Sequence, residues 1–227
     1  MITTLLLASL IGQTKSPTLT YTEKRVEGWR VMISPEAAKQ KEKTAAVMAL
    51  LTTKLKEITK VCPKDAVKFF KTITLWFDDG KTGTQGGAYH PSKEWLKGHG
   101  YNPDMAGGIE FGNLDNFIGW TKLNQPYMVL HELAHAYHFG VLGNDQRVLD
   151  VFKAAVESKK YEMVEYIPSG KKRHYALNNE KEFFAEATEA YFGKNDFYPF
   201  VRKDLAAFDP AAYKMIEECY GIKRSTN

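Results

Sequence analysis

The spacing of apolar side chains predicts a chain that begins with strands and ends mostly in helices. Apolar and polar residues alternate in patches between Thr18 and Ser34, which predicts a pair of strands or one long bent strand. Ser34-Pro35 is typical of a helix start, with serine as the cap and proline in the first turn. An amphipathic helix is then predicted to run to about Thr59, with its apolar stripe formed by Val47, Leu51, Leu55 and Ile58.

The middle of the chain has the pattern of short strands separated by loops. A β-branched and aromatic run over residues 72–77 predicts a core strand. Two further short strands are predicted at Ile109–Asn113 and Asn116–Trp120. Residues 81–105 are rich in Gly, His and Pro, which predicts an ordered loop layer over a sheet edge.

Helices are predicted to dominate the second half. Gln125-Pro126 favours the start of a helix that runs through about Phe139, and Gly140 and Gly143 favour its end. Further helices are predicted near residues 145–158, 180–192 and 210–220. Strands early and helices late indicate an α+β fold.

Length and charge limit the classes of function. The 227 residues are enough for one well-cored domain, and no linker divides them. The formal net charge of +4 is mild, and the short run Lys171-Lys172-Arg173 reads as a solvated loop, so we expect no nucleic-acid partner. We expect a monomer.

The first 15 residues read as a signal peptide. Ile2 to Gly12 is apolar but too short to span a membrane, which favours export and a secreted or periplasmic location. The alternative is an N-terminal strand or helix packed on the core, because no Lys or Arg precedes the apolar run. No later segment of the chain predicts stable membrane insertion. Residues 16–227 are predicted to form a single catalytic domain.

The two cysteines, Cys62 and Cys219, lie far apart in the sequence. In an oxidising compartment they could form a disulfide that fastens the last helix to the early part of the fold. Two buried thiols are an equal alternative.

The clearest chemical signal is His131-Glu132-Leu133-Ala134-His135, an HExxH motif inside a predicted helix. Residues four apart lie on one helix face, so both imidazoles can bind one zinc ion and leave a position open for water. Glu132 follows the first histidine directly and can take a proton from that water as general base.

The third ligand is predicted on a later helix. His138 lies near the same face as His131, but three ligands along two turns of one straight helix cannot surround one ion. His138 is therefore predicted to pack against other side chains or to support one of the metal ligands. Glu182 is favoured because Glu186, one turn later, can accept a hydrogen bond from a ligand histidine. Glu180 competes, but the residue four positions after it is Phe184.

The HELAH motif followed by YALNNEKEFFAEA, which holds Glu182 and Glu186, resembles the catalytic domain of anthrax toxin lethal factor and its relatives over residues 127–192. The resemblance implies a zincin fold, a glutamate as third zinc ligand, Glu186 as the supporting carboxylate, and Tyr175 as the phenol that stabilises the oxyanion. From the residues alone, Tyr175 could equally be a packed loop residue. The family's substrates do not carry over, because the first half of the chain does not match.

Three further expectations concern the surroundings of the motif. A peptide substrate is expected to pair with an edge strand, for which Gly108 to Asn113 is the candidate, although this segment could equally be an interior strand. His174 is expected at the surface. His90 and His99 are expected at the surface or packed in the loop region, since neither has ligand spacing.

The sequence therefore favours a secreted zinc endopeptidase that acts on a peptide or protein substrate. The alternatives are an amide or ester hydrolase for a non-peptide substrate and a zinc-stabilised binding module without turnover. Glu132 argues against the binding module, because a purely structural zinc site needs no such carboxylate.

Overall fold

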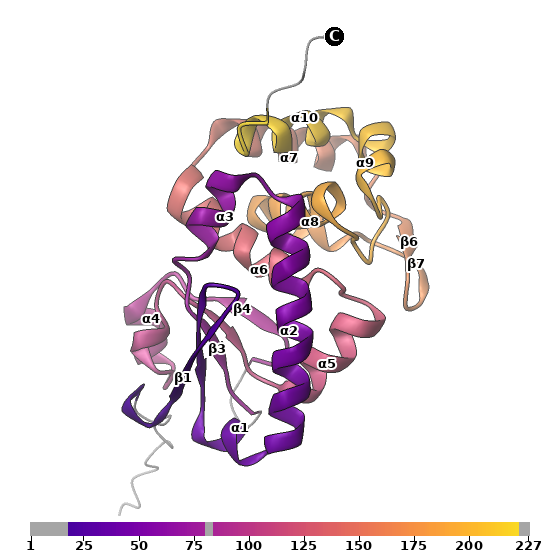
Figure 1. The fold of residues 1–227 in the computed structure, drawn as a ribbon. Coiled ribbons are helices and arrows are strands. Elements are labelled where there is room, and N and C mark those ends of the chain that lie inside the picture. The colour runs from indigo at the N-terminus through magenta and orange to yellow at the C-terminus, as the bar shows by residue number, and fades with distance from the viewer. Residues whose placement is uncertain (1–17, 80–83, 223–227) are drawn as a thin grey trace, which may run out of the picture.

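The strands predicted near the N-terminus form a hairpin at one side of a five-stranded sheet (Figure 1). The computed structural model describes residues 18–79 and 84–222. Strands β1 (Thr22–Val26) and β2 (Trp29–Ile33) are antiparallel, whereas β2, β3 (Leu75–Phe77) and β5 (Ile109–Phe111) run parallel. The last strand, β4 (Gly87–Tyr89), is antiparallel to β5 and completes the order β1-β2-β3-β5-β4.

Alternate residues of the central strands face two different clusters of apolar side chains. Leu75 and Phe77 of β3 belong to the main core, together with the helices, whereas Trp76 faces a smaller cluster on the other side of the sheet. The smaller cluster includes Leu96 from helix α4 (Lys93–Gly98). Both faces of the sheet are therefore covered, which explains why β3 and β5 are buried along their whole length.

The predicted first helix forms in two parts. The Ser34 side chain accepts a hydrogen bond from the Ala37 N–H and caps α1 (Pro35–Lys39), and Gln40 separates it from α2 (Lys41–Val61). The predicted apolar stripe of α2 is fully buried. Pro63 follows α2 and precedes α3 (Lys64–Phe70), as a residue that cannot continue a helix but can begin one.

The strand predicted at Asn116–Trp120 is wrong, because this segment lies within helix α5 (Leu114–Leu123). The Asn113 side chain accepts a hydrogen bond from the Asn116 N–H and caps the helix, which is the local preference of asparagine at this position. Leu114, Phe117 and Thr121 are buried at helical spacing.

The remaining helices gather beyond the end of the sheet (Figure 1). Helix α6 (Met128–Tyr137) continues into a π-helical turn, His138–Leu142, and ends at Gly143, which has a φ of +60°. The helices predicted near residues 145–158, 180–192 and 210–220 are present, and α9 and a small hairpin were not predicted. These elements are α7 (Gln146–Ser158), β6 (Val164–Tyr166), β7 (Gly170–Lys172), α8 (Glu180–Phe192), α9 (Arg202–Phe208) and α10 (Pro210–Cys219).

An α+β fold with a small mixed sheet is thus confirmed. Short 3-10 turns complete the described chain at Thr18–Thr20, Pro103–Met105 and Tyr175–Asn178. Among the described residues, none of the helices combines the length and the apolar content needed to cross a lipid bilayer. The predicted signal peptide at residues 1–15 lies outside the described residues.

Candidate metal and catalytic site

The HExxH motif lies on α6, which packs against α8. In both helices most side chains are buried, so polar residues on their shared face are held in fixed positions. His131 and Glu132 are 7% exposed, and Glu182 projects from the first turn of α8 toward them. Two helices that are distant in sequence therefore bring the candidate ligands together.

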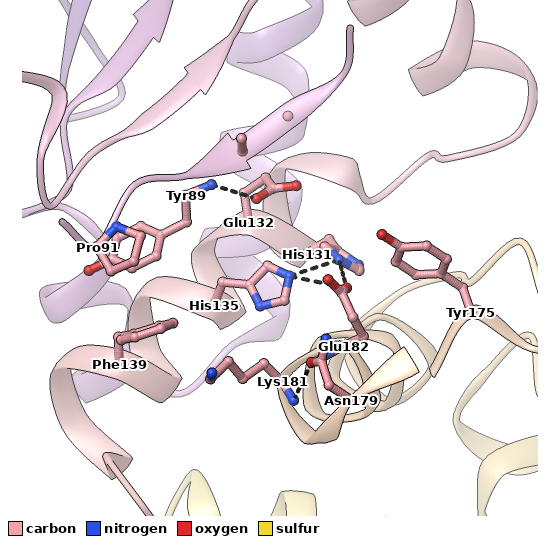
Figure 2. A pocket seen from close by; sticks show the side chains of 12 residues that line it. Tyr89, Pro91, His131, Glu132, His135, Phe139, Tyr175, Asn179, Lys181 and Glu182 are labelled. Carbon is pink, nitrogen blue, oxygen red and sulfur yellow. Dashed lines mark hydrogen bonds and ion pairs between the residues drawn. The ribbon is translucent and has the colours of Figure 1, made fainter. Parts of the chain in front are cut away.

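Three side-chain atoms form a small triangle at this contact (Figure 2). The His131 Nε2 atom lies 3.1 Å from the His135 Nε2 atom and 3.1 Å from the Glu182 Oε2 atom. The third side, from His135 Nε2 to Glu182 Oε2, measures 3.3 Å. The structure thus brings together the three predicted ligands.

The opposite nitrogen of His131 determines what this triangle can bind. The His131 Nδ1 atom lies 2.7 Å from the Glu189 Oε1 atom, and a carboxylate at that distance accepts the Nδ1 proton. A cation that displaces the remaining proton, on Nε2, then meets a lone pair directed at the other two electronegative atoms. A cation placed among the three atoms removes their mutual repulsion, so the arrangement has the chemistry of a metal site.

The predicted supporting role of Glu186 needs correction, because Glu189 makes the hydrogen bond to His131. The nearer Glu186 oxygen is 3.6 Å from the His131 Nδ1 atom, and Asn195 holds the Glu186 carboxylate by donating its amide to Oε2 at 2.8 Å. Glu189 is seven residues after Glu182 and so lies on the same helix face. That spacing made Glu189 a candidate in the sequence, but Glu186, four residues after Glu182, shares the face, so spacing alone did not separate the two.

Acidic side chains accumulate behind the histidines. Burial raises the pKa values of Glu186 and Glu189, and burial together with the nearby Glu189 charge raises the pKa of Asp196 to about 7. Among the described residues, the buried Oε2 atom of Glu189 has no hydrogen-bond partner. Burying several carboxyl groups is costly unless positive charge is near, so this cluster also fits a cation at the adjacent triangle.

The hydrogen bonds among these side chains shift the pKa values of two candidate ligands, Glu182 and His131. Burial tends to raise the pKa of Glu182, but hydrogen bonds from His131 and His135 hold it well below its usual range. Burial tends to lower the pKa of His131, yet the hydrogen bonds to Glu182 and Glu189 outweigh it and raise this pKa. Glu182 is therefore ionised at neutral pH, as a candidate oxygen ligand of a metal has to be.

Glu132 lies against the edge strand β4 rather than in the triangle. Its Oε2 atom accepts a hydrogen bond from the Tyr89 N–H at 2.9 Å. A Cβ atom on Gly87 would lie 2.6 Å from the Glu132 Cγ atom, so the absence of a side chain at Gly87 permits this close approach. The carboxylate is thus positioned by a backbone group of the strand.

Residues 109–111 form β5, which lies between β3 and β4, so the edge placement is wrong and the alternative of an interior strand is confirmed. The edge beside the motif is β4, a three-residue strand within the region predicted as loops. In its antiparallel pairing with β5, Ala88 is opposite Glu110. Backbone groups alternate in direction along such a strand, and the bond from the Tyr89 N–H to Glu132 indicates that Gly87 and Tyr89 point away from β5.

A cleft of about 320 Å³ opens beside the triangle (Figure 2). Tyr175 lines it, is 46% exposed, and directs its hydroxyl toward His131; the two ring centroids are 6.5 Å apart. Burial and the Glu182 charge raise the pKa of Tyr175, so the phenol keeps its proton at neutral pH. We call this cleft the catalytic cleft after its candidate role, and it is lined by Gly87, Ala88, Tyr89, Pro91, His131, Glu132, His135, Phe139, Tyr175, Asn179, Lys181 and Glu182.

The other histidines lie outside the triangle. His138 is buried, with its ring centroid 5.4 Å from that of Phe184, in agreement with the predicted packing role. His90 is packed in the loop region and lies 2.9 Å from the buried Glu110, and His99 stacks on Trp95.

His174 is not at the surface as predicted. It is 2% exposed, stacks on Phe197, and its Nδ1 atom accepts a hydrogen bond from the Ala176 N–H. It follows the exposed basic residues of β7, so its neighbours in the sequence give no sign of its burial. Burial lowers the pKa of His174 to about 3.

The low pKa of His174 predicts a loss of stability in acid. An unfolded histidine takes up a proton near pH 6.5, whereas the folded one resists protonation down to about pH 3. Its contribution is therefore present above about pH 6.5 and decreases as the pH falls, by up to about 1.4 kcal/mol per pH unit. Urea unfolding of the metal-free protein between pH 7 and pH 4 measures this slope.

The His174→Asn variant is the matched comparison, because its amide oxygen can also accept the Ala176 N–H and does not titrate. We expect a shallower pH dependence of the free energy of unfolding for the variant. Equal slopes for the two proteins would contradict the assignment of this acid sensitivity to His174.

The two cysteines are buried free thiols in this structure. Burial raises the pKa of each thiol to about 12, so neither has the character of a reactive thiolate. The candidate chemistry of the protein therefore remains with the histidines and glutamates.

Comparisons of the chain with protein-family models, with curated proteins and with solved structures find no match. The functional interpretation consequently rests on the residues of this site.

Proposed function

We propose that the protein is a zinc-dependent endopeptidase. The observation that carries the proposal is the convergence of His131, His135 and Glu182 beside Glu132, in a cleft bordered by a strand edge. The resemblance of residues 127–192 to the catalytic domain of anthrax toxin lethal factor supports the same reading, including a zincin-like fold.

The spacing of the three candidate ligands supports zinc. Tetrahedral zinc with bonds to nitrogen and oxygen of about 2.1 Å places its ligand atoms about 3.4 Å apart. The sides of the triangle, 3.1, 3.1 and 3.3 Å, are close to this value. Two imidazoles and one carboxylate are also a ligand set of catalytic zinc, which keeps its fourth position open.

A zinc ion held by these residues would supply Lewis acidity, which polarises a peptide carbonyl and lowers the pKa of water. Glu132 is the residue that accepts the proton of the attacking water and passes it to the leaving amine. The hydrogen bond from the Tyr89 N–H fixes the Glu132 carboxylate in the cleft.

Strand β4 offers the binding edge for the substrate. Gly87 and Tyr89 line the cleft and direct backbone groups away from β5. The Tyr89 N–H bonds to Glu132, so an extended peptide can add to the sheet there through the backbone groups of Gly87 and the carbonyl of Tyr89. Such pairing holds the main chain without selecting its side chains. It favours a peptide over a small amide as the substrate.

Tyr175 is proposed to donate its phenol proton in a hydrogen bond to the oxyanion formed during peptide hydrolysis. Its hydroxyl faces the cleft and stays protonated at neutral pH. Replacing Tyr175 with phenylalanine is expected to lower kcat about a hundredfold, because one oxyanion donor is lost. KM and the zinc content, measured on the same preparations, should remain close to the wild-type values. A kcat within twofold of wild type would remove Tyr175 from this role.

Glu189 is proposed to hold His131 in the tautomer and orientation that zinc requires. The Glu189→Gln variant keeps the size and an acceptor oxygen but loses the charge, so zinc affinity is expected to fall about 10- to 100-fold. Competition with a chromophoric chelator measures this affinity. Glu186→Gln, another buried carboxyl on the same helix, is the matched comparison and should have the smaller effect. A larger effect of Glu186→Gln would reassign the supporting carboxylate.

The proposed function as a whole is tested by measuring zinc content and peptide-library cleavage on one wild-type preparation. We expect one zinc ion per chain and cleavage products identifiable by mass spectrometry. Stoichiometric zinc without cleavage of any peptide would contradict the peptidase proposal and leave hydrolysis of a non-peptide amide or a binding role.

A further inference from the structure

A second cleft lies against the end of β4, beyond the catalytic cleft. Its volume is about 480 Å³, and Ala88, Tyr89 and Pro91 line both clefts. We call the second one the aromatic cleft. Its residues are Thr84, Ala88, Tyr89, His90, Pro91, Ser92, Trp95 and Tyr101.

The rings of the aromatic cleft are held in place before any ligand arrives. Trp95 stacks on His99 with centroids 4.1 Å apart and lies 5.6 Å from the ring of Tyr101. The Ser92 side chain accepts a hydrogen bond from the Trp95 N–H and so caps the helix that carries this residue. Trp95 nevertheless remains 48% exposed, which is unusual for so large an apolar side chain and leaves binding surface available.

We propose that the aromatic cleft binds an apolar or aromatic side chain of the peptide substrate, near but not adjacent to the cleaved bond. This inference rests on the proposed endopeptidase function. Glu132 lies against Gly87 and Tyr89, and the chain runs on from there through His90 and Pro91, which line the aromatic cleft. Two residues of an extended peptide span about 7 Å, so a peptide paired with β4 reaches the aromatic cleft two to four residues from the cleaved bond.

The charges around the aromatic cleft favour a neutral side chain over a basic one. Lys93 and Lys97 are exposed on α4, the helix of Trp95, and outnumber its one acidic residue, Glu94. The buried Glu110 nearby is already bonded to His90 and Thr84. A lysine or arginine of the substrate would thus gain ring contacts but find no carboxylate among the described residues that line the cleft.

The test compares quenched fluorescent peptides that carry phenylalanine, lysine or alanine at each position within four residues of the cleaved bond. With wild-type protein, phenylalanine at one position two to four residues away is expected to raise kcat/KM about tenfold over alanine. The Trp95→Ala variant should reduce this preference to less than twofold. Leu123→Ala, which removes another exposed apolar side chain, on α5, should leave the preference unchanged.

A binding measurement separates this inference from the peptidase proposal. Acetyl-Ala-Phe-Ala-amide is added to ¹⁵N-labelled Glu132→Gln protein, and the Trp95 indole N–H signal is identified by its absence in a Trp95→Phe variant. We expect this signal to shift with the phenylalanine peptide and not with its lysine counterpart.

Cleavage and binding results together distinguish failure of the aromatic cleft from failure of the peptidase proposal. Cleavage without a phenylalanine preference, or a preference that persists in Trp95→Ala, overturns the aromatic cleft and leaves the peptidase intact. A shifted Trp95 signal without cleavage of any peptide overturns the peptidase and keeps the recognition of an apolar side chain. A preference for lysine overturns the assignment of a neutral ligand.

Discussion

Replacing Glu132 with glutamine is expected to lower peptide cleavage by at least about a hundredfold while zinc stays bound. Glutamine has nearly the same size and can still accept the Tyr89 N–H, so the contact with β4 is preserved. Its amide cannot accept the proton of the attacking water. Three measurements on one preparation test this expectation. They are kcat/KM for one library-derived peptide, the zinc content, and the Tm, which reports whether the contact with β4 is preserved.

Glu180→Gln is the control for that variant. Glu180 begins α8 and was the competing candidate for the third ligand, but it does not line the catalytic cleft. We expect its zinc content and kcat/KM to stay within about twofold of wild type, since surface substitutions usually have small effects. Full activity of Glu132→Gln would end the assignment of a general base, whereas loss of zinc would show a structural defect instead.

The parts of the site that follow from local helix geometry could be predicted from the sequence. Two histidines four residues apart share a helix face wherever the helix lies, so His131 and His135 required no tertiary information. The choice of Glu182 depended on a second helix, which the structure brings against α6. Glu189 required the exact rotation of α8, because Glu186 and Glu189 both lie on the face that meets His131.

The elements that were not predicted are short or held by distant contacts. Strand β4 has only three residues, begins with glycine and shows no alternation, so its pairing with β5 and its contact with Glu132 decide its structure. His174 is buried by the ring of Phe197, which follows it by more than twenty residues. Asn113 shows the converse, because its capping role is a local preference of asparagine, yet strands were predicted on both sides of it.

Replacing His135 with alanine is expected to lower zinc affinity by more than about a hundredfold, beyond the 10- to 100-fold effect typical of residues that only support a ligand. His135 contacts both other members of the triangle. In wild type, free zinc at about 100 times its dissociation constant should add about 2.7 kcal/mol to the free energy of unfolding. Removing zinc with a chelator should therefore lower the Tm of wild type and leave that of His135→Ala unchanged.

His138→Ala is the matched control, because both histidines follow the motif's first ligand within two helical turns. Its ring packs on Phe184, so the variant is expected to lose about 1–3 kcal/mol of stability with and without zinc. The chelator should still lower its Tm by nearly the wild-type amount. If zinc-dependent stabilisation instead disappeared in His138→Ala and persisted in His135→Ala, the ion would have to be bound at the π-helical turn beyond α6, and Glu182 could not be its third ligand.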